Sequence, residues 1–291
     1  MRPSAAGSAL LVSVASAVLA ACAATVPRVE RPRDPPRAER PPARARGRGL
    51  TQPGEEPPST PAAAPVRAVT IGAGGDVLVH LKVARSALEH EDEGGFEHVL
   101  GELREVVGDD EIAFVNLETP LSERVPAETG DPPVLGAPAS VASALAAAGI
   151  DVASVANNHS YDQTALGMED TLRALSAARV RAVGAGPSEE EAPGPVVVEQ
   201  GGVRVAFLAF TERINRGPVA RDTSARVPRF ERELAARALA RAREQADVVV
   251  VSMHWSHDFV ESPRLAQRAL ARWLVERGAD VILGHGPHVL Q

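Results

Sequence analysis

Apolar runs alternate with amphipathic stretches along the chain from residue 69 onward. The short runs predict strands over residues 69–72, 112–117, 152–156, 180–183, 196–199, 203–210, 248–252 and 281–283. Helical spacing of apolar residues between them predicts helices over residues 96–107, 139–148, 166–178, 231–245 and 265–277. Strands that alternate with helices favour an α/β fold with a largely parallel sheet. Gln200-Gly201-Gly202 between two of the strands indicates one antiparallel hairpin.

Polar residues of metal-binding types stand directly after five of the predicted strands. Because the carboxyl ends of parallel strands share one edge of a sheet, we expect these side chains to converge there. Carboxylates together with imidazoles suit Zn, Mn or Fe better than Mg or Ca. The residues at these strand ends are Asp76, Glu118, Asn158, His159, His254, His285 and His288.

Each of these residues also has an ordinary structural interpretation. Asn157-Asn158 is a typical helix cap, and His254 beside a tryptophan fits a packed core histidine. Asp162, three residues after His159, fits equally a partner that orients the imidazole and a cap of the next helix. The shared position at strand ends favours the functional interpretation. We interpret the histidines that lack this position as surface residues, namely His80, His90 and His98.

The first 68 residues differ in composition from the rest of the chain. Residues 1–22 predict an export signal, because the apolar run from Ala9 to Leu19 is too short to span a membrane. The run ends in Leu19-Ala20-Ala21-Cys22, which resembles a bacterial lipobox; an ordinary signal peptide with an incidental cysteine is the alternative. Cys22 is the chain's only cysteine and stands where lipidation requires one, so we favour the lipobox. Residues 23–68, rich in Pro and Arg, predict a disordered tether.

Charge and composition exclude several classes of function. The chain has 31 basic and 38 acidic residues, and the acidic excess falls after residue 68. An acidic domain is a poor candidate for nucleic-acid binding. No Gly-x-x-x-x-Gly-Lys-[Ser/Thr] loop occurs, which argues against P-loop nucleotide chemistry. The predicted export signal and lipobox lead us to expect an extracytoplasmic protein of the cell envelope. Lipid on Cys22 would anchor it to a membrane.

Five motifs are spread over residues 69–291. In chain order they are Gly75-Asp76-Val77-Leu78, Asn116-Leu117-Glu118-Thr119-Pro120-Leu121, Ala156-Asn157-Asn158-His159 with Asp162, His254-Trp255, and Gly284-His285-Gly286-Pro287-His288-Val289-Leu290-Gln291. In kind and in order these motifs resemble those of the CapA family of poly-γ-glutamate capsule synthesis proteins. That family is similar to the calcineurin-like metallophosphatases. The resemblance implies a four-layer α/β/β/α sandwich with a metal centre at the strand ends.

The resemblance also implies roles for individual residues. It implies one or two divalent ions of Mn, Fe or Zn, held by Asp76, Glu118, Asn158, His254, His285 and His288. We expect His159 and Asp162 to be catalytic. The expected substrate-binding residues are Asn116, His257 and Asp258.

Three motifs depart from the family pattern. Leu78 stands where metallophosphatases usually have the His of Asp-x-His, so one expected ligand is missing. Ser256, Asp258 and Phe259 replace residues of the usual His-Trp-Gly-x-Glu-Tyr. Gly286 replaces the middle His of Gly-His-His-Pro-His. Family members continue past this last motif, so we also expect the sequence to be truncated at its carboxyl end.

Three hypotheses about function follow. The first is a metal-dependent, phosphoesterase-like hydrolase or transferase that acts on a phosphoryl or acyl group in capsule synthesis or export. The second is a non-catalytic capsule assembly factor that binds anionic polymer, and a phosphodiesterase unrelated to capsule is a third. The expected partners are poly-γ-glutamate or another anionic envelope polymer, the membrane through the lipid anchor, and a capsule-synthesis ligase.

Overall fold

The computed structural model describes residues 68–107, 110–188, 190–217 and 225–291. The predicted export signal with Cys22 and nearly all of the predicted tether therefore lie outside the described residues. Within the described part of the chain, no helix has the length and apolar character that a membrane span requires.

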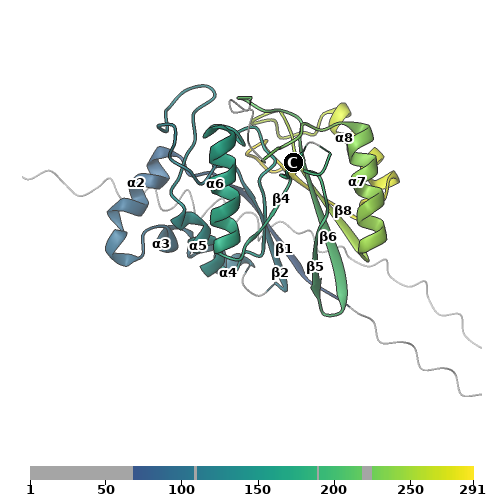
Figure 1. The fold of residues 1–291 in the computed structure, drawn as a ribbon, viewed down its shortest axis with the longest axis horizontal. Helices are drawn as coiled ribbons and strands as arrows, with labels where there is room; N and C mark the ends of the chain where they lie inside the picture. Colours follow the sequence, from purple (N-terminus) through teal and green to yellow (C-terminus); the bar gives the residue numbers. More distant parts are fainter. Residues whose placement is uncertain (1–67, 108–109, 189, 218–224) are drawn as a thin grey trace, which may run out of the picture. The chain divides into compact units, whose positions relative to one another are not determined.

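Eight strands form two four-stranded sheets among the described residues (Figure 1). In the first sheet all neighbours are parallel, in the order β1 (Ile71–Val77), β2 (Ile112–Leu117), β3 (Val152–Ser154) and β4 (Arg181–Val183). The second sheet has the order β5 (Val196–Gln200), β6 (Val203–Thr211), β7 (Val248–His254) and β8 (Val281–His285). In that sheet β5 runs antiparallel to β6, and the other neighbours are parallel. The hairpin is confirmed: its turn residues Gly201 and Gly202 have φ of 59° and 74°, values that glycine adopts without strain.

The two sheets face each other across one hydrophobic core. All six residues of β2 are buried, as a strand covered on both faces should be. Phe114 of β2 and Phe207 of β6 stack with ring centroids 5.6 Å apart, so they join the sheets directly. Side chains of both sheets belong to this same core cluster.

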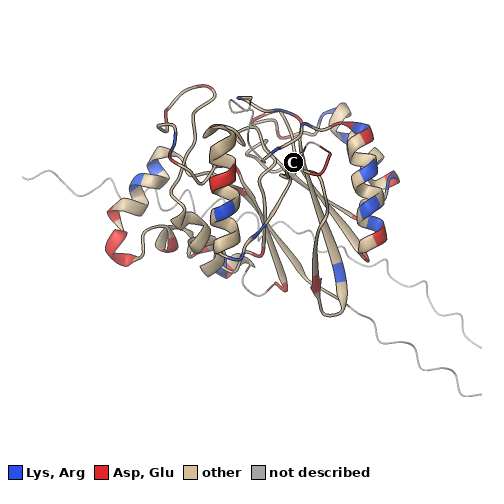
Figure 2. Cartoon of the chain, in the orientation of Figure 1, with Lys and Arg blue, Asp and Glu red and all other residues tan. Residues whose placement is uncertain are grey.

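Helices cover the outer face of each sheet. On the first sheet lie α5 (Ser140–Ala147) and α6 (Thr164–Ala177), and on the second lie α7 (Arg232–Gln245) and α8 (Leu265–Glu276) (Figure 1). Figure 2 shows charged residues mainly on the helices and turns. The strands are mostly uncharged, as expected of buried sheets. The predicted α/β fold with four α/β/β/α layers is confirmed.

The segment between β1 and β2 differs from the prediction. It holds α2 (Leu81–Glu89), the short 3₁₀ helix η1 (Glu91–Glu93), α3 (Phe96–Leu100) and α4 (Leu103–Val107). The single helix predicted over residues 96–107 is wrong, because the chain breaks it at Gly101. Glycine is a poor helix former, and the N–H of Gly101 bonds the carbonyl of His98 in a tighter turn.

We expect the Phe114–Phe207 pair to dominate the stability of the sandwich. Phe114→Ala should lower the free energy of unfolding by about 3–5 kcal/mol, because it leaves a cavity between the sheets. Urea denaturation measures the change. Phe259→Ala is the matched control, since that ring is 74% exposed, and it should leave stability nearly unchanged. Equal effects of the two variants would contradict this account of the core.

Asp170 of α6 ties the loop after β2 to the helix. It accepts hydrogen bonds from Ser122 Oγ at 2.8 Å and from Arg124 Nε at 2.6 Å. The hydrogen bond from Arg124 holds the pKa of Asp170 below its ordinary value. A folded-state pKa below the unfolded one adds stability above the unfolded pKa, and that stability is lost as the pH falls.

Asp170→Asn should therefore cost about 1 kcal/mol of unfolding free energy at pH 7. The difference from the wild type should shrink as the pH falls below about 3.9, where the unfolded carboxyl becomes protonated. Urea titrations at several pH values test this. The exposed Asp92→Asn is the control, and a pH-independent difference for Asp170→Asn would refute the prediction.

Candidate metal centre

The carboxyl ends of four strands bring the predicted metal residues together. In the first sheet Asp76 of β1 pairs in register with Asn116 of β2. In the second sheet His254 of β7 pairs with His285 of β8. The edge strands β1 and β8 are in contact, so the two sets of side chains meet where the sheets join.

An irregularity in β1 places Asp76. The sequence predicted a strand that ends at residue 72, but β1 continues to Val77. Between the pairs Ala73↔Phe114 and Asp76↔Asn116, β1 contains one residue more than β2. A bulge of this kind re-aims a side chain, and such bulges are frequent next to active sites.

Asp76 is the centre of a charged hydrogen-bond cluster. Its Oδ2 lies 3.0 Å from His288 Nδ1, and its Oδ1 lies 3.5 Å from His285 Nδ1. Asn116 Nδ2 donates to Oδ1 at 2.8 Å. Burial alone would raise the pKa of Asp76, but the neighbouring imidazoles of His285 and His288 hold it well below its usual range. The hydrogen bond between His288 and Asp76 in turn raises the pKa of His288.

Glu118 lies at the bottom of the site. Its side chain is 0% exposed, and Oε1 lies 3.4 Å from His254 Nε2 and 4.0 Å from His288 Nε2. Ligand atoms of Asp76, Glu118 and His288 all lie within 4.8 Å of one another, a spacing that one ion can bridge. The two carboxylates thus share histidine neighbours.

Several buried polar atoms of the site have no hydrogen-bond partner among the described residues. Native proteins rarely leave buried polar atoms unpaired, so each such group requires an explanation. These atoms include both oxygens of Glu118, both ring nitrogens of His254 and of His285, and Oδ1 of Asn158. Carboxylate oxygen, imidazole nitrogen and amide oxygen are ligands of divalent metals, and the set fits Mn, Fe or Zn. The donor set therefore fits the implied metal.

His159 and Asp162 form a buried pair beside this cluster. Asp162 Oδ2 lies 2.6 Å from His159 Nδ1 and accepts the N–H of Leu135 at 2.8 Å. Asp162 is not the cap of α6: the N-cap residue is Gln163, and it makes no side-chain cap hydrogen bond. Of its two interpretations, the structure supports the one in which Asp162 orients the imidazole.

The remaining predicted residues have different positions. Asn116 is fully buried and donates to Asp76. This position suits a residue that orients the Asp76 carboxylate better than one that contacts substrate. His257 is half-buried with an unpaired Nδ1, and Asp258 is exposed near His288, whose pKa its charge helps to raise. A Cβ on Gly286, which has φ of 97°, would overlap the carbonyl of Trp255, so glycine is required there.

Three polar residues around the site were given no site role from the sequence, although Asn157 was named as a possible helix cap. Asn157 donates to the carbonyl of Leu117 and accepts the N–H of His159, so it joins the loops after β2 and β3. Glu212 directly follows β6 and accepts the N–H of Ser256; the strand-end rule applied to β6 would have found it. Asn215 Nδ2 lies 3.5 Å from His159 Nε2, and no sequence signal marks it.

Comparison with known proteins agrees with the sequence motifs. The family model described as bacterial capsule synthesis protein PGA_cap matches residues 70–291. The chain is 35% identical over 161 residues to the capsule biosynthesis protein CapA of Bacillus anthracis, covering 54% of this chain and 39% of that protein. It is 36% identical over 137 residues to the PGA biosynthesis protein CapA of Bacillus subtilis strain 168, covering 47% and 36%. The chain thus spans about two fifths of the length of the curated relatives it matches.

Two solved structures are also similar. A hypothetical protein from Thermus thermophilus aligns over 75% of this chain and 68% of its own, with 21% identity and a TM-score of 0.39. A 5'-nucleotidase precursor from the same organism aligns over 68% of this chain and 44% of its own, with 14% identity and a TM-score of 0.36.

We predict that Glu118→Gln removes the stabilisation that a divalent metal gives. At Mn²⁺ a hundredfold above the dissociation constant, the wild type should gain about 2.7 kcal/mol, and the variant far less. The metal-free variant should be at least as stable as the metal-free wild type, because a neutral amide costs less to bury than a carboxylate. Thermal melting and metal content by mass spectrometry test both points. Glu123→Gln, an exposed glutamate nearby, should behave as the wild type.

Proposed function

The chain belongs to the bacterial capsule synthesis protein family PGA_cap, and on that premise we propose that its described domain is a metal-dependent hydrolase or transferase of capsule poly-γ-glutamate metabolism. One observation carries the proposal. Glu118, His254 and His285 have unpaired, buried ligand atoms at the carboxyl ends of their strands, and the His159–Asp162 pair follows β3, the strand next to β2. A binding protein has no need of a buried, oriented imidazole beside a metal cluster, whereas a hydrolase does.

Six residues would hold the metal in this proposal. Asp76 and Glu118 supply negative charge, Asn158 an amide oxygen, and His254, His285 and His288 neutral nitrogens. When bound, the metal supplies Lewis-acid activation of water and of the attacked group. Asn116 keeps the Asp76 carboxylate oriented through its 2.8 Å hydrogen bond.

His159 would transfer the proton. Its Nδ1–H donates to Asp162, which fixes the ring orientation and leaves Nε2 as the reacting nitrogen. The imidazole is only 6% exposed, so bulk water does not compete for that position. Such a positioned group typically contributes a factor of about 10²–10⁴ to the rate.

The setting outside the cytoplasm is part of the same proposal. A lipid on Cys22 and the Pro/Arg-rich segment would hold the domain at a membrane surface within reach of an anionic envelope polymer. A capsule-synthesis ligase is the expected partner. These points rest on the sequence of residues 1–68 and on the family.

We predict that His159→Gln greatly slows turnover and retains the metal. The loss should be about 10²–10⁴-fold, because the proton transfer is removed while the ligands stay in place. Release of product from poly-γ-glutamate by the metal-loaded full chain is the activity measurement, and mass spectrometry gives the metal content. His98→Gln, on the exposed side of α3, is the matched control. Wild-type protein that binds metal and polymer without turnover would favour the non-catalytic assembly factor.

A further inference from the structure

The carboxylate of Asp162 depends on one backbone donor for its orientation. Its Oδ2 lies 2.6 Å from His159 Nδ1 and accepts the N–H of Leu135 at 2.8 Å. Among the described residues no other group donates to this carboxylate, and its Oδ1 is buried without a partner. A carboxylate held only by its imidazole would be free to turn with it. The N–H of Leu135 is therefore the contact that fixes the carboxylate.

Leu135 belongs to the loop between β2 and α5, residues 120–137. The two legs of this loop pair with each other, because Glu128 and Val134 exchange backbone hydrogen bonds of 3.0 Å in both directions. Leu135 directly follows that antiparallel bridge. Its position therefore depends on how the loop is held against the rest of the domain.

Gln163 holds both legs of the loop. Its Oε1 accepts the N–H of Val125 at 2.7 Å. Its Nε2 donates to the carbonyl of Val125 at 2.7 Å and to the carbonyl of Leu135 at 2.9 Å. The side chain is 0% exposed, so bulk water cannot replace these hydrogen bonds. The adjacent residues Asp162 and Gln163 thus hold the same loop residue, one through its N–H and the other through its carbonyl.

Two glycines make the space for Gln163. A Cβ on Gly136 would lie 2.5 Å from Gln163 Nε2, and a Cβ on Gly167 would lie 2.3 Å from Gln163 Cβ. A larger residue at either position would therefore displace the side chain. The next residue, Thr164, has φ of 65°, a strained conformation for a β-branched residue. Such strain persists only where the surroundings enforce it, and it concentrates at functional sites.

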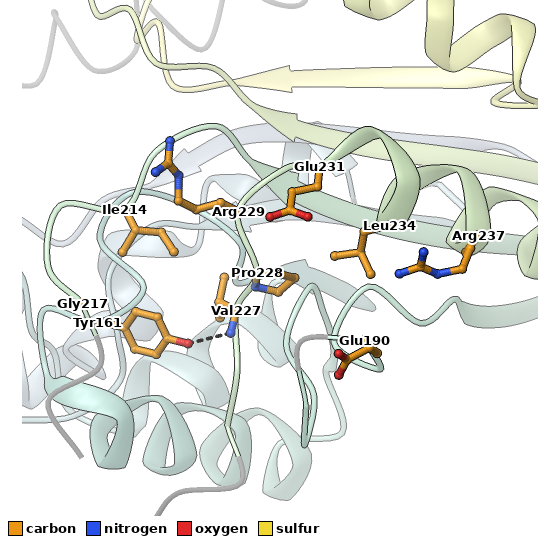
Figure 3. A pocket seen from close by; sticks show the side chains of 10 residues that line it. All are labelled: Tyr161, Glu190, Ile214, Gly217, Val227, Pro228, Arg229, Glu231, Leu234 and Arg237. Carbon is orange, nitrogen blue, oxygen red and sulfur yellow. Dashed lines mark hydrogen bonds between the residues drawn. The ribbon is translucent and has the colours of Figure 1, made fainter. Parts of the chain in front are cut away.

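The other side of the same segment has a separate anchor. Figure 3 shows the hydroxyl of Tyr161 directed at Val227, whose N–H it accepts at 2.7 Å. Val227 lies in the segment between β6 and α7, so this contact does not involve the loop after β2. Loss of the Gln163 contacts would therefore loosen only the side that carries Leu135.

We propose that Gln163 is a positioning residue for the proton transfer, and that the loop of residues 120–137 helps to orient His159; this rests on the proposed function. Gln163 fixes Leu135, and the N–H of Leu135 fixes the carboxylate of Asp162. That carboxylate fixes Nδ1 of His159, so that Nε2 keeps one direction. Without Gln163 the imidazole turns together with its carboxylate, and fewer rings have the reacting orientation.

Gln163→Met tests the proposal with little change in side-chain volume. Methionine fills the space between the two glycines but cannot form the three hydrogen bonds. The first readout is the Nδ1–H proton of His159 in NMR spectra of the full chain loaded with diamagnetic Zn²⁺, with the signal identified by its absence in His159→Gln. The short hydrogen bond to a carboxylate predicts a downfield, slowly exchanging signal in the wild type. Gln163→Met should broaden the signal or move it upfield.

Kinetics supply the second readout. In Gln163→Met, kcat for the reaction of the proposed function should fall about 10–100-fold, the range for outer partners of histidines in metal sites. KM and Zn²⁺ content should stay as in the wild type. Gln163→Asn keeps an amide that is one methylene shorter, so it should recover part of the signal and of kcat. It also replaces the methionine variant if that protein does not fold.

Asp170→Asn is the matched control. It loosens the same loop at Ser122 and Arg124 but leaves the hydrogen bonds of Leu135 in place. The His159 signal and kcat should therefore match the wild type, whatever stability the variant loses.

The possible outcomes are distinguishable. A changed His159 signal together with a lower kcat in Gln163→Met supports the inference. An unchanged signal, a changed signal with wild-type kcat, or an equal change in Asp170→Asn overturns it and leaves the metal-dependent hydrolase in place. A folded, metal-bound wild type without turnover overturns the proposed function and the inference with it.

Discussion

A buried carboxylate without a hydrogen bond is the constraint on which the site depends. Glu118 is 0% exposed, and neither of its oxygens has a hydrogen-bond partner among the described residues. Burying such a charge is costly unless a cation or a good donor compensates it. His254 and His288 lie 3.4 and 4.0 Å away, too far to be strong donors but well placed to share an ion with Glu118. A divalent ion shared with these histidines would compensate the charge of Glu118.

The packing of the core fixes the positions of these groups. Phe114 stacks on Phe207 across the sheets, and its ring also lies 5.9 Å from the ring of His285. The register of β2 with β1, and of β7 with β8, then places Asp76 and His254 at the same edge. Neither sheet carries the complete ligand set, because Asp76 and Glu118 come from the first and the histidines from the second. The packing of the sandwich is therefore a condition for metal binding.

Much of the fold, and the meeting of candidate ligands at the strand ends, was predictable from the sequence, and the exceptions are instructive. Continuous apolar runs such as residues 248–252 identify buried strands, and a parallel sheet puts the residues after them at one edge. The bulge in β1 was not predictable, because its glycines equally favour a turn. The sequence could not decide whether the Asp162 side chain bonds His159 or caps the next helix. Asn215, in the segment after β6 of the second sheet, contacts His159 after β3 of the first. These are tertiary contacts that no local pattern encodes.

The candidate ligands differ in how far they are exposed. Glu118, His254 and His285 are buried, whereas the His288 side chain is 25% exposed and lies beside the exposed Phe259. His288 and Phe259 both have positive φ, 54° and 56°, a strained conformation for residues other than glycine. Such strain persists only where the surroundings enforce it, and it concentrates at functional sites. The hydrogen bond from the N–H of Phe259 to the carbonyl of Pro287 joins the two segments and so helps to fix the position of His288.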